Sequence, residues 1–241
     1  MLDILLLSTS TVHGARFLEY AEDEIRAFLS GRSTVLFVPF ARPSGMTHDA
    51  YTGQVRERLG ELGLGVDGLH EFDEPAAAVR EADAVFVGGG NTFVLLRALY
   101  ETGALQPLRE RALAGMPYMG SSAGSNLAGL TIGTTNDMPI VQPESFRALA
   151  LLPFNINPHY LDPDPGSTHM GETRETRIGE FHRFNPQPVL GLREGAMLRV
   201  EGDSARVIGT RGGRLFRAES EPVEIDSGSD VSFLLEAGAG A

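Results

Sequence analysis

Short, largely apolar runs recur along the first half of the chain, separated by segments with helical spacing. The apolar runs, which are typical of strands in a parallel sheet, occupy residues 2–8, 34–40, 64–72, 81–90 and 116–120. The helical segments, in which apolar residues recur at one face, occupy residues 17–31, 48–63, 91–103 and 104–114. This alternation predicts an α/β fold with a doubly wound, mostly parallel sheet.

The pattern changes after about residue 186, where short alternating segments are separated by glycine turns. These segments, which predict an antiparallel extension of the sheet, are residues 189–195, 196–202, 205–213 and 231–238. No linker, repeat or second core is evident in the sequence. We therefore expect one α/β domain over residues 1–241, with a frayed tail at 237–241.

Composition narrows the possible partners and location. A hydrophobic content of 42% in 241 residues is enough for a sizeable core. No apolar stretch approaches the roughly 18 to 20 residues of a membrane helix, and the N-terminal MLDILLL lacks the basic leader of a signal peptide. We expect a cytoplasmic protein with no membrane partner. A net charge of -12 also disfavours a nucleic-acid partner, because binding phosphates requires clustered Lys and Arg.

The chain contains no cysteine, which excludes disulfides, thiolate metal sites and a cysteine nucleophile. Any covalent catalysis must therefore use an oxygen or an amine. The motif H-E-x-x-H is missing, and the histidines and carboxylates lack metal-ligand spacing. We expect no metal and no cofactor, and we interpret Asp162, Asp164 and His169 as a polar loop with a structural or rim role.

One segment has the sequence of a nucleophile elbow. Residues 120–124 (GSSAG) match G-x-S-x-G, in which the glycines let a strained serine project from a strand-to-helix turn. Ser122 occupies the central position, after the predicted strand 116–120 and before a helix. The alternative is an ordinary tight turn, since small residues serve both purposes.

A second glycine segment, GGGN at 88–91, also follows a predicted strand. Sites in such sheets form at the carboxyl ends of strands, so both glycine segments are expected at one crevice. The elbow would aim the Ala123 amide N–H at an oxygen that becomes negative, and Gly89 or Gly90 would supply a second N–H. Asn91 would cap the helix that follows.

A serine nucleophile requires a base and a carboxylate. His159 lies in NPHY, which directly follows the strand-like LLPFNI at 151–156, and Glu194 lies in GLREG, at the end of the strand-like VLGL at 189–192, so both belong at strand ends. Asp137 is the alternative carboxylate. Of the remaining histidines, we interpret His70 and His182 as structural. We interpret His13 and His48 as loop residues that border the crevice. The order Ser, His, Glu differs from the Ser, Asp, His order of α/β-hydrolases and argues against a lipase or esterase.

Together, GSSAGSN, TTNDMPIVQP, NINPHYLDP, HMGETRETRI and LREG closely resemble peptidase E, the α-aspartyl dipeptidase family of serine peptidases. The resemblance begins at LLLSTSTVHG near the N-terminus and covers most of the chain. It implies a flavodoxin-like sandwich akin to class I glutamine amidotransferases, with serine in place of their cysteine. It also implies that Ser122 is the nucleophile, His159 the base and Glu194 the acid. The chain departs from the family at Ser121, where a bulky aromatic residue is frequent.

The resemblance implies removal of an N-terminal aspartate from Asp-X dipeptides through an acyl-enzyme. A protein of net charge -12 must then bind a side-chain carboxylate, and the planar fork of arginine suits this task. We favour Arg174 in GETRE as the aspartate reader, with Arg177 as second choice. The alternative is that both arginines pair with neighbouring glutamates on a solvated helix.

Three other functions are compatible with parts of the sequence. A cyanophycinase-like enzyme would use similar residues on an aspartate-arginine polymer. A catalytically inactive, amidotransferase-like protein would bind a small acidic metabolite, but the intact serine, histidine and glutamate argue against it. A nucleotide-binding Rossmann protein is disfavoured because G-x-G-x-x-G is missing. A homodimer is possible, since it is the commonest soluble oligomer.

Overall fold

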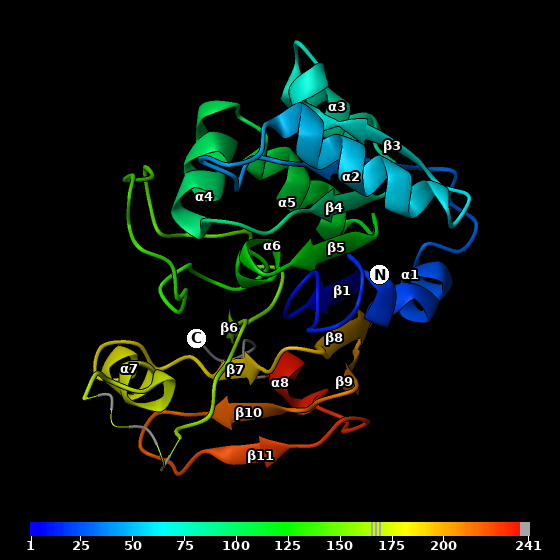
Figure 1. The fold of residues 1–241 in the computed structure, drawn as a ribbon. Helices are drawn as coiled ribbons and strands as arrows, with labels where there is room; N and C mark the ends of the chain where they lie inside the picture. The colour runs from blue at the N-terminus through cyan, green and yellow to red at the C-terminus, as the bar shows by residue number, and fades with distance from the viewer. Residues whose placement is uncertain (165, 167, 169, 237–241) are drawn as a thin grey trace.

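The computed structural model describes residues 1–236 except 165, 167 and 169, and its largest element is a seven-stranded sheet (Figure 1). The strand order is β3-β2-β4-β5-β1-β8-β9. The strands are β1 (Asp3–Leu7), β2 (Thr34–Val38), β3 (Gly65–Gly68), β4 (Val85–Val87), β5 (Tyr118–Ser121), β8 (Ala196–Glu201) and β9 (Ser204–Gly209). The first five in this order are parallel, whereas β8 and β9 are antiparallel. The predicted mostly parallel α/β fold is confirmed.

Helices cover both faces of this sheet. Side chains of α1 (Glu22–Phe28) and α2 (His48–Gly60) pack with Leu5 and Leu7 of β1. The opposite face, which includes Ile4 and Leu6, packs against α3 (Pro75–Glu81), α4 (Thr92–Glu101) and α5 (Leu105–Leu113). These four apolar side chains of β1 are fully buried, and burying one such residue stabilises the fold by about 1.5–3 kcal/mol. Burial on both faces explains why the strands are continuous apolar runs.

A second, four-stranded sheet was not predicted from the sequence. Its strands are β6 (Asn155–Asn157), β7 (Val189–Leu192), β10 (Gly213–Phe216) and β11 (Val223–Ile225), in the order β11-β10-β7-β6. Figure 1 shows β10 and β11 at the lower edge of the molecule, β6 and β7 level with β8 and β9 of the main sheet, and α7 (Arg174–Phe181) beside the second sheet. Ile178 of α7 packs with Tyr160, Val189 and Phe216 in a small separate cluster. The predicted antiparallel extension is therefore divided: β8 and β9 extend the main sheet, whereas β7 and β10 belong to the second one.

Three local predictions differ from the structure. The expected strand at 231–238 contains α8 (Phe233–Glu236), because the Asp230 carboxylate accepts the Ser232 N–H at 2.9 Å and turns the chain. The expected strand at 64–72 ends at Gly68, whose N–H is bound by Glu71, and continues as a 3-10 turn, η2 (Leu69–Glu71). The helix expected at 17–31 begins with the 3-10 turn η1 (Glu19–Ala21), after Leu18 at φ 55°, before α1. The predicted frayed tail at 237–241 lies outside the described residues.

The short helix α6 (Ala123–Asn126) follows β5 directly and packs against β4, β1 and β6. The GSSAG turn therefore lies at the carboxyl ends of β4, β5 and β1, which are neighbours in the main sheet. Among the residues that the structure describes, no helix has the length and apolar character needed to cross a membrane.

Candidate active site

Ser122 forms the turn between β5 and α6 in a strained backbone conformation. Its φ and ψ are 52° and -110°, outside the regions that non-glycine residues favour. The turn is held in place because the Ser122 N–H donates to the Leu7 carbonyl at 3.0 Å. At Gly124, a Cβ would lie 2.2 Å from the Val87 carbonyl oxygen, so only glycine allows α6 to approach β4 this closely. The local geometry is that of a nucleophile elbow.

The structure brings Ser122, His159 and Glu194 together in one hydrogen-bonded chain. Ser122 Oγ lies 2.9 Å from His159 Nε2, and His159 Nδ1 lies 2.7 Å from Glu194 Oε1. A carboxylate can only accept a hydrogen bond, so Nδ1 carries the hydrogen and Nε2 of the neutral ring is free to accept the serine proton. The Glu194 side chain is 57% exposed, whereas the aspartate of the Ser-His-Asp triad is buried.

The other histidines of the described chain form no hydrogen bond with Ser122. His48 begins α2, and its ring packs 5.4 Å from the Phe40 ring. His70 Nε2 lies 2.9 Å from an Asp49 oxygen, and His182 Nε2 lies 3.2 Å from the Gln187 carbonyl. His13 is exposed in the loop after β1, while His169 lies outside the described residues.

Asp137 caps α4 and is not hydrogen-bonded to His159. One of its oxygens, Oδ2, accepts the Thr92 N–H at 2.7 Å, the Thr92 hydroxyl at 2.6 Å and the Thr135 hydroxyl at 3.0 Å. A carboxylate is favoured there because the amino terminus of a helix carries partial positive charge. Of the two carboxylates considered from the sequence, Glu194 is therefore the one in contact with the imidazole.

Two backbone N–H groups beside Ser122 have no hydrogen-bond partner among the described residues: those of Ala123 and Gly90. Gly90 has φ 144°, and a Cβ there would lie 2.2 Å from the Ala41 carbonyl oxygen, so this position requires glycine. Asn91 Oδ1 accepts the Val94 N–H at 3.1 Å and caps α4, as expected from the sequence. Its Nδ2 donates to the Met138 carbonyl at 2.9 Å.

Gly89 does not present a free N–H. Its N–H donates to the hydroxyl of Tyr51 at 3.0 Å. Of the two glycines expected to supply a second N–H to the oxyanion, only Gly90 therefore remains. Gly89 instead lies against the elbow, where a Cβ would be 3.0 Å from the Ser122 Cβ. Tyr51 is fully buried in α2, edge-on to Phe37, and burial raises the pKa of its hydroxyl. Nothing in the amphipathic pattern of this helix distinguishes Tyr51 from an ordinary core residue.

A cavity of about 450 Å³ lies beside the loop that carries His159. It is lined by Asn136, Leu161, Asp162, Pro163, Asp164, Gly171, Glu172, Thr173, Arg174 and Arg177. The Asn136 side chain donates to the carbonyl of Pro158, the residue before His159, at 2.7 Å. This bond connects the cavity wall to the histidine.

The two arginines of this cavity differ in their surroundings. Arg177 lies 3.8 Å from Glu172, whereas Arg174 forms no ion pair with any described residue. Burial, followed by the charge of Arg177, lowers the pKa of the Arg174 guanidinium, and Asp137 opposes this change. Asp162, expected to be structural, binds Arg193 through two contacts of 2.7 Å, next to Glu194. Of the two, Arg174 is thus the arginine without a carboxylate partner among the described residues.

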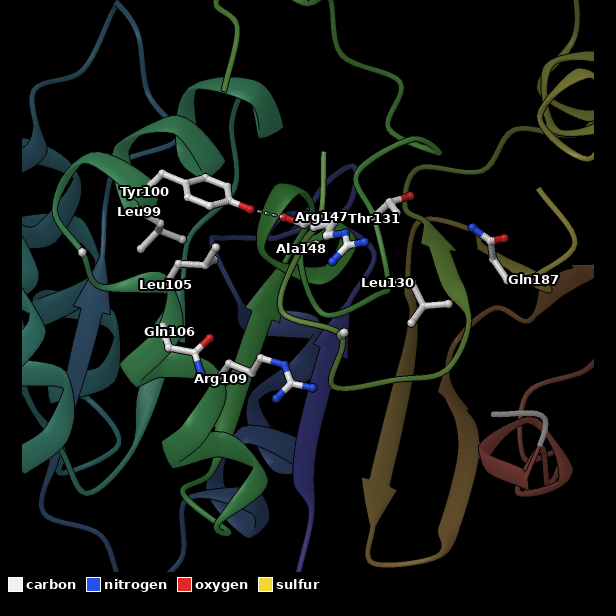
Figure 2. A pocket seen from close by; sticks show the side chains of 12 residues that line it. Leu99, Tyr100, Leu105, Gln106, Arg109, Leu130, Thr131, Arg147, Ala148 and Gln187 are labelled. Atoms are coloured by element: carbon white, nitrogen blue, oxygen red, sulfur yellow. Dashed lines mark hydrogen bonds between the residues drawn. The ribbon is translucent and has the colours of Figure 1, made fainter. Parts of the chain in front are cut away.

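A larger cavity, of about 670 Å³, has a separate set of lining residues (Figure 2). Its lining includes Leu105, Leu130, Arg109 and Arg147, and none of Ser122, His159 or Glu194. We therefore do not assign it to the active site. Similarly, Asp49, His70 and Glu71 have ligand atoms within 4.8 Å of one another, but the Glu71 oxygens already accept from Arg56 and Gly68. We assign no metal to this group.

The chain is similar to known peptidases over nearly all of its length. Residues 4–208 match the family described as peptidase family S51. Peptidase E of Streptomyces coelicolor is 55% identical over 235 residues, which cover 98% of this chain and 96% of that protein. A Drosophila melanogaster protein named "Probable alpha-aspartyl dipeptidase" is 51% identical over 237 residues, covering 97% of this chain and 98% of the relative.

The solved structures support the fold. The crystal structure of a peptidase from an acI-B1 Actinobacterium superimposes with a TM-score of 0.71 at 18% identity and covers 97% of each chain. At this identity the likeness concerns the architecture alone, while the sequence matches are extensive enough to define the family. The chain belongs to peptidase family S51.

Proposed function

We propose that this protein is a serine dipeptidase that removes an N-terminal aspartate from Asp-X dipeptides through an acyl-enzyme. The observation that carries the proposal is the continuous hydrogen-bonded chain from Ser122 through His159 to Glu194, at a strained elbow with free N–H groups beside it. The names of the two relatives, peptidase E and alpha-aspartyl dipeptidase, support the same reaction class.

The geometry suggests a defined sequence of proton transfers. Ser122 Oγ attacks the aspartyl carbonyl carbon while its proton passes to His159 Nε2, and Glu194 stabilises the resulting imidazolium. The N–H groups of Ala123 and Gly90 stabilise the oxyanion. The C–N bond then breaks, and His159 gives its proton to the departing amine. Water attacks the acyl-enzyme with His159 again as base, which releases aspartate and returns the proton to Ser122.

Arg174 is the proposed reader of the aspartate side chain. Its guanidinium faces a cavity beside the His159 loop and has no carboxylate partner among the described residues. An incoming carboxylate would accept two parallel hydrogen bonds from it. Arg177 raises the local positive charge, while its own guanidinium is shared with Glu172.

The test compares Asp-Leu with Ala-Leu hydrolysis. We expect Ser122→Ala to lose several orders of magnitude in kcat for Asp-Leu. Arg174→Ala should lower kcat/KM for Asp-Leu by about 10- to 100-fold, the value of a hydrogen bond to a charged group. Arg174→Lys should show a smaller loss because it keeps the charge without the fork.

Two controls separate recognition from chemistry. Arg177→Ala is the matched arginine variant and should affect Asp-Leu far less than Arg174→Ala. Wild-type hydrolysis of Ala-Leu at the same rate as Asp-Leu would contradict aspartate selectivity. An aspartate-arginine polymer serves as a further substrate, and its preferential cleavage would favour a cyanophycinase-like enzyme instead.

A further inference from the structure

Ser8, at the end of β1, joins the two chain segments that carry His159 and Glu194. Its side chain is fully buried. The hydroxyl accepts the His159 backbone N–H at 2.9 Å and donates to the Leu192 carbonyl at 2.8 Å. Leu192 is the last residue of β7, two positions before Glu194. A single hydroxyl thus connects the main sheet to both segments.

The same strand end also holds the nucleophile. The carbonyl of Leu7 accepts the Ser122 N–H at 3.0 Å and the Ser125 hydroxyl at 2.7 Å. On the other side of Glu194, the Ser8 N–H donates to the Ala196 carbonyl at 3.1 Å. Leu7 and Ser8 therefore position the three turns that carry the serine, the histidine and the glutamate.

The bond to the His159 N–H matters because of the backbone conformation at that residue. His159 has φ 52°, in the left-handed region that non-glycine residues seldom occupy. Such a conformation persists only where surrounding contacts fix it. Ser8 supplies one of those contacts on the histidine itself, and the Tyr160 N–H, which donates to the Leu192 carbonyl at 2.9 Å, supplies the next.

We infer that Ser8 is a positioning residue for the Ser122–His159–Glu194 triad, because its hydroxyl bonds fix the His159 backbone between the ends of β1 and β7. It acts through His159 and has no contact with the reacting atoms. The inference rests on the proposed function, in which His159 must meet both Ser122 and Glu194. A misplacement of about 1 Å at such a centre can cost about 100-fold in rate.

The test is the Ser8→Ala variant, assayed for Asp-Leu hydrolysis with kcat and KM determined separately. We expect kcat to fall about 10- to 100-fold and KM to stay within about twofold, because the substrate contacts remain. The rate of Ser122 labelling by a fluorophosphonate should fall in parallel. Ser8→Cys retains a weak donor and acceptor in similar space, so its kcat should lie between those of Ser8→Ala and wild type. If Ser8→Ala does not fold, the kcat of Ser8→Cys tests the inference in its place.

The matched control is Ser232→Ala. Ser232, directly before α8, also accepts a backbone N–H at 2.9 Å, that of Ala205 in β9. We expect it to lower Tm without changing kcat. Wild-type kcat in Ser8→Ala, or an equal fall in kcat for Ser232→Ala, would overturn the inference. Undiminished Asp-Leu hydrolysis by Ser122→Ala would overturn the proposed function itself, so the two failures are distinguishable.

Discussion

The turns β4–α4 and β5–α6 are built alike, yet they differ at the residue that precedes each helix. Each joins a buried parallel strand to a helix, with glycines in the turn or on either side of it. In the first turn, Asn91 has an extended backbone and its side chain caps α4. In the second, Ser122 occupies the equivalent position at φ 52° and its side chain forms no cap. Its hydroxyl lies instead against His159.

The turn at Ser122 lacks the side-chain cap of the turn at Asn91, and its backbone is strained. A side-chain cap contributes about 1 kcal/mol, and a strained non-glycine residue costs about 1–3 kcal/mol. Other bonds in the same turn offset these losses. The Ser125 hydroxyl donates to the carbonyls of Leu7 at 2.7 Å and Gly120 at 2.9 Å, and the Tyr118 hydroxyl donates to Gly124 at 2.7 Å. Neighbouring side chains thus stabilise the turn, while the Ser122 hydroxyl remains available to His159.

The largest expected difference in kcat is between variants of two carboxylates, Glu194 and Asp137. Glu194→Gln removes the acceptor that orients the imidazole, and we expect kcat to fall by about 10²–10⁴. Asp137→Asn removes charge from the start of α4, so it should lower Tm with a much smaller effect on kcat. Steady-state kinetics and thermal unfolding of both variants measure this contrast. A larger loss of kcat in Asp137→Asn than in Glu194→Gln would reverse the assignment of the acid.

The glycine loop before α4 is expected to affect the reaction through one N–H group. Gly90→Ala introduces a Cβ into the space of the Ala41 carbonyl and must displace the loop. We expect kcat to fall by about 10²–10³, the effect of removing one oxyanion donor. Gly53→Ala is a suitable control, because a Cβ added there would meet no atom within 4 Å and the φ of Gly53 is ordinary. Unchanged kcat in folded Gly90→Ala would remove Gly90 from the oxyanion site.

The smallest expected effect is on the free energy of unfolding, through the residue that precedes each helix. Asn91→Ala removes the side chain that accepts the Val94 N–H, and we expect a loss of about 1 kcal/mol in the free energy of unfolding. Ser122→Ala removes no cap and should be neutral or slightly stabilising. Denaturant unfolding of the two variants compares them directly. An equal loss of stability in both would show that Ser122 supports the helix as Asn91 does.

The sequence was informative where a strand end and a glycine motif coincide. Ser122 directly follows β5, whereas His159 and Glu194 each lie two positions after the end of a strand, and apolar runs indicate such strands well. The choice of Glu194 over Asp137 depended on the family resemblance, because placement along the chain alone left both carboxylates open. The roles of Tyr51 and Ser8 were not foreseen, since each depends on a contact with a residue far away in the chain. The second sheet was missed for a related reason: alternation indicates a strand without indicating its partner.

The central claim, that Ser122 and no neighbouring serine is the nucleophile, is tested most directly by covalent labelling. The enzyme is incubated with a fluorophosphonate, digested and sequenced by mass spectrometry while Asp-Leu hydrolysis is followed. Ser121 Oγ is buried and Ser125 Oγ is engaged with two carbonyls, so we expect a single adduct on Ser122 that forms in step with loss of activity. An adduct on Ser121 or Ser125, or full activity after stoichiometric labelling of Ser122, would contradict the account.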